Sequence, residues 1–182
     1  MNDLVLSEEV LWDGSFFRVK RQRVRGSDGK HFFRELASRR DGVAVIPIQA
    51  DGRVIMIREY AAGARQSLLF FPGGQTEAVN ESQRQQEAQK ELREEIGFRA
   101  NRLIKLWQTF EAPAMLERRT HIYLGFDLVA DPIPNPDDGV IEPVPMTIDE
   151  AIENVRQPDG SSAAVVGALF LAREYLANHP VA

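Results

Sequence analysis

The sequence predicts an α/β fold. Apolar runs at residues 42–48, 53–57 and 121–129 have the composition of core strands. Residues 88–96 place apolar side chains at the four-residue spacing of one helical stripe, and residues 163–176 form a second apolar segment of helical length. Strands and helices that follow one another in this way pack as a sheet covered by helices.

Composition restricts the class of protein. A chain of 182 residues can bury a sizeable core without dividing into several domains. It has no Cys, which excludes disulfides and thiolate metal sites and suits a reducing compartment. The net charge of -5 argues against a general nucleic-acid binder, and no membrane-spanning run or signal peptide is evident. We therefore expect a cytoplasmic protein without a membrane anchor.

The first forty residues predict an extended β region. Residues 9–12, 16–25 and 31–36 are rich in β-forming side chains, and the GSDG run at residues 26–29 is a turn signal. The second of these segments is strongly basic. Its cations have two interpretations, since they can attract phosphate groups or blunt an exposed sheet edge against further strand pairing.

The segment after this region predicts a hairpin of two central strands, 42–48 and 53–57, because Asp51-Gly52 between them is a tight-turn signal. Arg58 closes the second strand and is either a clamp for phosphate groups or the ion-pair partner of a surface acid. The Pro-Gly-Gly run at residues 72–74 predicts a loop whose backbone can approach a ligand closely.

A helix that ends near residue 96 carries several carboxylates. Its amino-terminal cap is Ser82 or Asn80, each followed three residues later by Gln, and Gly97 can end the helix in a left-handed conformation. The start of the helix is therefore open by about two residues.

The carboxylates predict a metal site. Glu91 and Glu95 lie about 6 Å apart on one helix face, with Glu94 beside them. Carboxylates this close repel unless a cation lies among them. Hard oxygen ligands without Cys or a nearby His favour Mg²⁺ or Mn²⁺ over Zn²⁺. The alternative is a solvated acidic face paired with Lys90 and Arg93.

The remaining chain predicts strands, a loop and a short helix. Residues 102–110 predict another strand, and we interpret His121, at the start of the following one, as structural. Prolines in residues 131–138 exclude helix and interior strand and so predict a loop. A capping box at residues 147–150 begins a short helix before the last apolar one.

Residues 71–98, FPGGQTEAVNESQRQQEAQKELREEIGF, resemble the Nudix box. That pattern is Gly, five residues, Glu, seven residues, Arg-Glu, an aliphatic, one residue, Glu-Glu, one residue, Gly, and then an aliphatic or aromatic residue. The positions that match in order are Gly74, Glu91, Leu92, Glu94, Glu95, Gly97 and Phe98. Lys90 replaces the Arg, which keeps the charge but loses the bidentate fork. Two extra residues before Lys90 leave Glu81 or Glu77 as the equivalent of the first box Glu.

The resemblance implies the fold and its domains. The Nudix fold is a mixed β-sheet sandwiched between helices (α/β/α), which we expect for the catalytic domain of residues 41–182. The branch of the family that cleaves ADP-ribose adds an N-terminal antiparallel β extension, which residues 1–40 match. Because that extension exchanges between protomers in the branch, we expect a homodimer formed through the N-terminal β region.

The resemblance also implies an activity and a cofactor. The carbonyl of Gly73 and the catalytic carboxylates of Glu91, Glu94 and Glu95 are expected to hold Mg²⁺ or Mn²⁺. The metal would neutralise a pyrophosphate and lower the pKa of the attacking water. The expected reaction is hydrolysis of a nucleoside diphosphate linked to another moiety, above all ADP-ribose to AMP and ribose 5-phosphate.

Further catalytic residues and a pyrophosphate clamp follow by position. Several relatives carry an Arg where this chain has Ala61, so Arg58 and Arg65 are the candidates to bind the pyrophosphate. Related enzymes draw a general base from an acidic loop, for which Asp138 and Glu142 are the candidates. The alternative for both acids is an ordinary solvated turn.

A substrate loop is expected after the strand at 102–110. Pro113 lies sixteen residues after Gly97, where the ADP-ribose branch has a proline in its substrate loop. Glu117 follows it and is a candidate to reach the substrate and metal, or else an ordinary surface side chain. A proline in a loop needs no function, so the signal rests on its spacing from the box.

Two other functions fit the same residues. One is Nudix chemistry on NADH, a dinucleoside polyphosphate, a sugar nucleotide or a capped RNA end. The other is a noncatalytic nucleotide-sensing module, against which the three helix carboxylates argue, because a pure binder needs no activated water. We expect a nucleotide-type small molecule as the partner and no nucleic acid.

Overall fold

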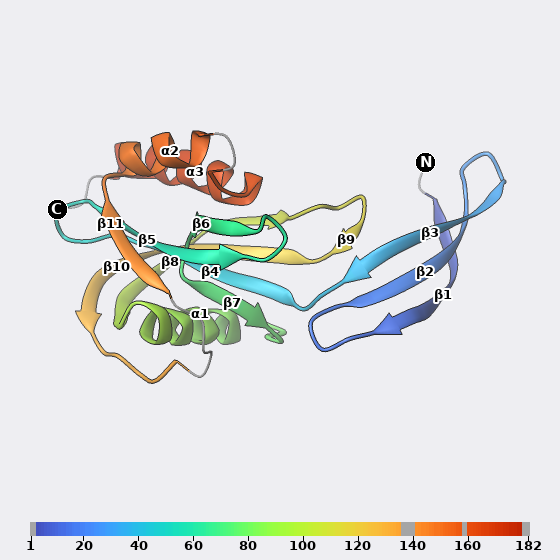
Figure 1. Cartoon of the computed structure of the whole chain (residues 1–182), viewed down its shortest axis with the longest axis horizontal. Coiled ribbons are helices and arrows are strands. Elements are labelled where there is room, and N and C mark those ends of the chain that lie inside the picture. Colours follow the sequence, from blue (N-terminus) through green and yellow to red (C-terminus); the bar gives the residue numbers. More distant parts are fainter. Residues whose placement is uncertain (1–2, 136–140, 158–159, 180–182) are drawn as a thin grey trace. The chain divides into compact units, whose positions relative to one another are not determined.

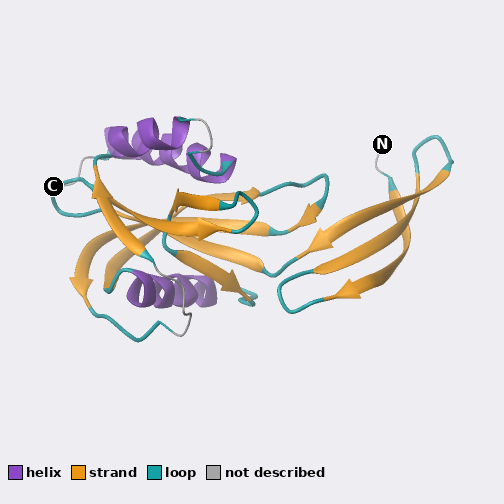
Figure 2. Cartoon of the chain, viewed as in Figure 1, coloured by secondary structure: helices purple, strands orange, loops and turns teal. Residues whose placement is uncertain are grey.

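The structure is a computed structural model that describes residues 3–135, 141–157 and 160–179. In the described residues, seven strands precede the first helix, four more follow it, and two helices come last (Figures 1 and 2). The elements are β1 (Leu4–Asp13), β2 (Arg18–Arg25), β3 (His31–Ser38), β4 (Asp41–Pro47), β5 (Val54–Ala61), β6 (Gln66–Phe70), β7 (Gly73–Thr76), α1 (Glu81–Glu95), β8 (Phe98–Phe110), β9 (Leu116–Glu117), β10 (Arg119–Ala130), β11 (Glu142–Met146), α2 (Ile148–Arg156) and α3 (Ala163–Asn178).

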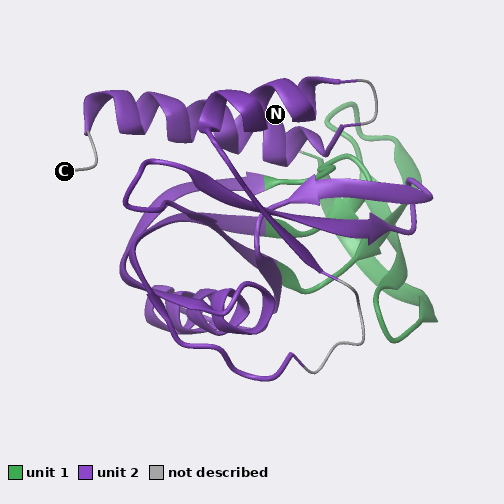
Figure 3. Ribbon diagram, turned by 60° about the vertical axis from the view of Figure 1, so that its left-hand side comes forward, with its two compact units in different colours: residues 1–41, 110–119 green, residues 42–109, 120–182 purple. Residues whose placement is uncertain are grey.

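The chain divides into two compact units (Figure 3). Unit 1 comprises residues 1–41 and 110–119, and unit 2 comprises residues 42–109 and 120–182. The first change of unit lies next to the domain boundary predicted after residue 40. Residues 110–119 join unit 1 because β9 pairs with β3 in a parallel ladder.

Unit 1 is one sheet with the strand order β1-β2-β3-β9. The predicted antiparallel N-terminal extension is confirmed, since β1 pairs with β2 and β2 with β3 in antiparallel ladders. The basic strand β2 lies inside this sheet, so its cations do not blunt an edge. Lys20 instead forms ion pairs with Glu8 at 3.0 Å and Glu117 at 2.8 Å, and Arg21 pairs with Glu35 at 2.7 Å.

Unit 2 contains two sheets, ordered β7-β4-β10-β8 and β11-β5-β6. In the first of them, β4 and β10 pair in a parallel ladder. The predicted central hairpin of β4 and β5 is wrong. Its turn forms, with Gly52 at a φ of 82°, but Ile48 and Val54 make only an isolated bridge. β7 and β10 occupy both edges of β4, while β6 and β11 occupy those of β5.

Helices cover both faces of the sheets of unit 2, with α1 on one face and α2 and α3 on the other (Figure 1). Alternate side chains of β5 point to opposite faces of its sheet. Ile55 and Ile57 belong to the apolar cluster that includes Leu92 of α1, whereas Val54 and Met56 belong to the cluster that contains α2 and α3. The predicted α/β/α arrangement is confirmed.

Two short strands form where the sequence indicated loops. Residues 73–76 make β7 beside β4, although the Pro-Gly-Gly run predicted a loop. The pairing needs glycine at position 73. A Cβ there would overlap the carbonyl oxygen of Val43 and lie 2.8 Å from the Cα of Ala44. Glu142 begins the second of these strands, β11.

Among the described residues, no helix is both long enough and apolar enough to cross a membrane. α2 begins with the predicted capping box, in which Thr147 and Glu150 bond each other's backbone amides. Ser162 caps α3, and its side-chain oxygen accepts the amide hydrogen of Val165. Both helices therefore begin where local sequence signals place them.

Candidate active site

The helix α1 carries the predicted carboxylates and is held at both ends. Of the two predicted caps, Asn80 is the one that forms, and its side chain accepts a hydrogen bond from the amide of Gln83 at 3.0 Å. Ala88 and Leu92 bury the inner face of the helix. Gly97, with a φ of 75°, provides the predicted left-handed end.

Glu95 is a carboxylate of this helix with a strongly raised pKa. Its Oε2 accepts a hydrogen bond from the amide of Gly73 at 2.8 Å. Burial raises the pKa of Glu95 to about 8, and the negative charges of Glu91, Glu59 and Glu94 add to the rise, whereas the Gly73 hydrogen bond opposes it. A carboxylate in this state favours a nearby cation, which would stabilise its charged form.

The carboxylate of Glu91 lies against the backbone of Gly74. A Cβ at position 74 would lie 2.6 Å from the Cδ of Glu91 and 2.9 Å from its Oε2. Only glycine therefore leaves the Glu91 carboxylate where it is. Two neighbouring glycines bring β7 against the helix carboxylates, Gly73 through its amide and Gly74 through the space it leaves.

Lys90, which stands where the Nudix pattern has Arg, pairs with Glu94. The Nζ of Lys90 lies 3.2 Å from the Oε2 of Glu94, whose side chain is only 8% exposed. This hydrogen bond raises the pKa of Lys90. The predicted role of Glu94 as a metal ligand thus stays a prediction, and a cation would have to share Glu94 with Lys90.

Glu81, one of the two candidates for the first box glutamate, ties α1 to the sheet. It accepts hydrogen bonds from Lys105 of β8 at 2.8 Å and from the hydroxyl of the fully buried Tyr123 of β10 at 2.7 Å. Burial works in the other direction, but these bonds hold the pKa of Glu81 below its ordinary value. Its contacts anchor the first turn of α1 to the sheet.

The chemistry of the donor set fits a hard divalent cation, because α1 carries several carboxylates next to the half-buried Glu95, whose pKa is raised. Their arrangement is not a closed ligand shell. Within residues 3–135, 141–157 and 160–179, no three His, Asp or Glu side chains converge as a metal site. A cation would therefore draw the carboxylates together on binding.

Sequence reasoning missed Glu59. It follows Ile57 by two residues in β5, and strand alternation directs both toward the face that α1 covers. Its charge contributes to the raised pKa of Glu95. The alternation of Ile55, Ile57 and Glu59 was a signal for this placement, but only the position of α1 gives it meaning.

Arg58 and Glu142 pair with each other rather than with α1. They are direct partners in the antiparallel ladder of β5 and β11, and their side chains meet at 3.5 Å. By register they share the face of Met56 and Val144, which packs against the cluster of α2 and α3. The structure therefore does not bring them together with the helix carboxylates.

The other predicted residues lie elsewhere. Arg65 ends the β5–β6 turn with a φ of 57°, and its amide donates to the carbonyl of Ala61. Pro113 and Glu117 belong to unit 1, where Lys20 holds the pKa of Glu117 below its ordinary value by a hydrogen bond. Asp138 lies outside the described residues. The roles predicted for these four residues stay predictions.

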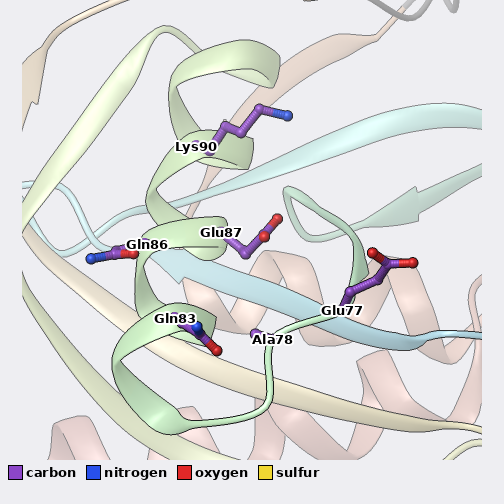
Figure 4. Close-up of a pocket in the computed structure, with 6 residues that line it drawn as sticks. All are labelled: Glu77, Ala78, Gln83, Gln86, Glu87 and Lys90. Atoms are coloured by element: carbon purple, nitrogen blue, oxygen red, sulfur yellow. The ribbon is translucent and has the colours of Figure 1, made fainter.

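An open pocket of about 400 Å³ lies beside the amino-terminal half of α1 (Figure 4). The carboxylates of Glu91, Glu94 and Glu95 do not line it, so it is separate from the predicted metal ligands. Its lining residues are Glu77, Ala78, Gln83, Gln86, Glu87 and Lys90.

Comparisons with known proteins agree with the geometry. Residues 38–166 match the family described as NUDIX domain. The chain is 30% identical over 177 residues to the ADP compounds hydrolase NudE of Escherichia coli (strain K12), covering 94% of this chain and 92% of that protein. It is 22% identical over 171 residues to an ADP-ribose pyrophosphatase of Bacillus subtilis (strain 168), covering 93% and 91%.

A solved structure shares the fold. The crystal structure of an ADP compounds hydrolase aligns with a TM-score of 0.87 at 27% identity, covering 100% of this chain and 98% of that one. The similarity thus includes the strands of unit 1 as well as the helix that carries the carboxylates.

Proposed function

Because the chain belongs to the Nudix family of hydrolases, we propose that it cleaves the pyrophosphate of ADP-ribose or a similar ADP compound, which releases AMP and a phosphorylated product. The observation that carries the proposal is the meeting of Glu95 and Glu91 with the Gly73-Gly74 backbone. The names of the relatives, an ADP compounds hydrolase and an ADP-ribose pyrophosphatase, support ADP compounds as the substrate class.

Nudix hydrolases need a divalent metal ion, and we propose Mg²⁺, or Mn²⁺ in its place, for this chain. Glu91, Glu94, Glu95 and the carbonyl of Gly73 would hold it. Bound there, the ion would supply charge neutralisation for the pyrophosphate and activation of the attacking water. The carboxylate oxygens suit both ions.

The chain's own residues orient the reactants. The amide of Gly73 holds Glu95, and the missing side chain of Gly74 leaves room for Glu91. Arg58 and Arg65 are proposed to bind the pyrophosphate, which would require Arg58 to exchange Glu142 for a phosphate group. Glu142, released from Arg58 in that exchange, is one proposed general base, and Asp138 is the other. Pro113 and Glu117 are proposed to contact the substrate.

The test is AMP release from ADP-ribose by the purified protein, with Mg²⁺ and with a chelator. NADH, diadenosine polyphosphates, sugar nucleotides and capped RNA serve as the comparison panel. We expect AMP release that requires the metal and is fastest with an ADP compound. Faster cleavage of another panel member would reassign the substrate, and ligand-induced stabilisation without any product would indicate a noncatalytic sensor.

We also propose that the protein is a homodimer formed through the sheet of unit 1. All ten residues of β1 are exposed, and this strand forms one edge of the sheet. An apolar surface of this extent on a sheet with an open edge is typical of a protein interface. The exposed apolar side chains of unit 1 include Leu4, Val5, Leu6, Val10, Leu11, Trp12, Phe16, Phe17 and Phe33.

Lysines on the edge strand should separate the protomers. The double substitution Val5→Lys and Val10→Lys places two charges on β1, which oppose pairing with another strand. We expect light scattering to give the mass of a dimer for the wild type and of a monomer for the variant. Val79→Lys is the control, because Val79 is 81% exposed and lies in unit 2. A monomeric wild type would refute the dimer.

The predicted cytoplasmic location stays a prediction.

A further inference from the structure

The parallel ladder of β3 and β9 in unit 1 (green in Figure 3) leads into two arginines. Its last partners are Ser38 and Glu117, so Arg39 and Arg118 are the next residues of the two neighbouring segments. The amide of Arg39 donates to the carbonyl of Glu117 at 3.2 Å, which keeps the two segments side by side at this point. Neighbouring positions of paired segments point their side chains to the same face, so the two cations are neighbours.

The acid nearest to them in the chain does not neutralise these cations. Glu117 accepts a hydrogen bond from Lys20 at 2.8 Å, and Lys20 also pairs with Glu8. Successive side chains of an extended segment point to opposite faces, so Glu117 and Arg118 face away from each other. The pair formed by Arg39 and Arg118 therefore lies on the face that Lys20 does not occupy.

Arg118 is largely buried and only partly compensated. Its side chain is 13% exposed, and its Nε lies 3.3 Å from the Oε1 of Glu111. Within the described ranges of the chain, this Nε has no hydrogen-bond acceptor. Burial lowers the pKa of Arg118 and the charge of Glu111 opposes this, while the charge of Arg39 lowers the pKa further.

Arg39 is less compensated than Arg118. Among the residues that the structure describes, no acid forms an ion pair with its side chain, and no acceptor meets its buried Nε. A buried donor without an acceptor costs free energy, as do like charges on neighbouring strands. The side chain as a whole is only half-buried, so a change of rotamer can turn its guanidinium toward an incoming anion.

We propose that Arg39 and Arg118 bind a phosphate group, carried by a phosphate monoester or present as free orthophosphate. The fork of a guanidinium matches two oxygens of a phosphate, and a dianion compensates two neighbouring cations, whereas Glu111 supplies one charge. All residues of this anion site belong to unit 1. The inference does not depend on the proposed cleavage of ADP-ribose.

The test measures phosphate binding by the full-length protein in chelator, at about pH 8, where phosphate is a dianion. Orthophosphate, ribose 5-phosphate and AMP are each titrated and followed by phosphorus NMR. We expect Arg39→Gln to raise the Kd about tenfold, the effect of losing one charge-assisted hydrogen bond. Arg39→Lys keeps the charge without the fork and should recover only part of the affinity.

The matched control is Arg25→Gln, which removes the same charge from an exposed position of unit 1. Arg25 pairs with His31 at one end of the β2–β3 ladder, whereas Ser38, next to Arg39, lies at the other end. This control should leave the Kd unchanged.

Melting temperatures distinguish a binding role of Arg39 from a structural one. Without phosphate, Arg39→Gln should melt at or above the wild type, because Arg39 has no ion pair to lose within the described residues and repels Arg118. Added phosphate, compared with chloride at equal ionic strength, should stabilise the wild type more than the variant. An Arg39→Gln protein that melts well below the wild type without phosphate would indicate a structural role and overturn the proposal.

The titrations identify the source of the phosphate group. Equal affinity for all three ligands would assign the site to the phosphate group alone, and tighter binding of AMP or ribose 5-phosphate would assign it to a phosphate monoester. A Kd that Arg39→Gln leaves unchanged, an equal loss in Arg25→Gln, or wild-type protein that binds none of the three would overturn the anion site. The assay of AMP release from ADP-ribose tests the proposed function separately.

Discussion

Glu95→Gln should lower turnover about a thousandfold and leave the fold intact. The amide cannot supply the charge that a divalent cation needs, and metal stabilisation of the transition state is worth several kcal/mol, with each ~1.4 kcal/mol worth a factor of ten. The Gly73 amide can still donate to the side-chain oxygen of Gln, so the local structure is retained. The measurement is AMP release at saturating Mg²⁺, with circular dichroism as the check of folding. Near-native turnover would remove Glu95 from the metal site.

The same substitution should change stability in a pH-dependent way. The pKa of Glu95 is about 8 in the folded protein against an ordinary value of 4.5. Between these pH values the folded protein keeps a proton that the unfolded chain loses, so the free energy of unfolding falls as the pH rises and stays low above about pH 8. Gln at this position has no proton to lose.

Melting temperatures measured in chelator test the direction of this pH dependence. Glu95→Gln should melt above the wild type at pH 9 and close to it at pH 4.5. Glu153→Gln, on the exposed side of α2, should match the wild type at both values. A Glu95→Gln protein that melts below the wild type at pH 9 would contradict the raised pKa.

Gly74→Ala should reduce turnover about a hundredfold with little change in melting temperature. The new Cβ would overlap the carboxylate of Glu91, which can turn away because it is the end of a flexible side chain. A displacement of about 1 Å in a catalytic group costs on the order of a hundredfold in rate. Mn²⁺ affinity measured without substrate should fall together with the rate of AMP release.

A matched glycine provides the control for this substitution. A Cβ at Gly63 would meet nothing within 4 Å, so Gly63→Ala should keep the rate and the Mn²⁺ affinity. The double variant Gly74→Ala with Glu91→Gln should lose less activity than the sum of the losses, in free energy, of the two single variants. The reason is that both substitutions act on one carboxylate. Full additivity would show that Gly74 acts elsewhere than through Glu91.

The sequence by itself determined the elements whose signals are local. The apolar stripe of α1 and the left-handed end at Gly97 appear as predicted, and the cap forms at Asn80, one of the two positions that the sequence left open. Capping and helical periodicity act within a few residues, so a single chain segment contains the whole signal. The spacing of Gly74, Glu91, Glu94 and Glu95 likewise identified the family that the comparisons show.

Only the tertiary structure decided which strands pair and which side chains meet. The Asp51-Gly52 turn predicted a hairpin, yet β4 and β5 joined different sheets, because strand pairing depends on the partners available at each edge. For the same reason Arg58 met Glu142 on one face of β5 while Glu59 came toward α1 on the other. Contacts between distant segments are set by packing of the whole domain, which no local pattern of the sequence contains.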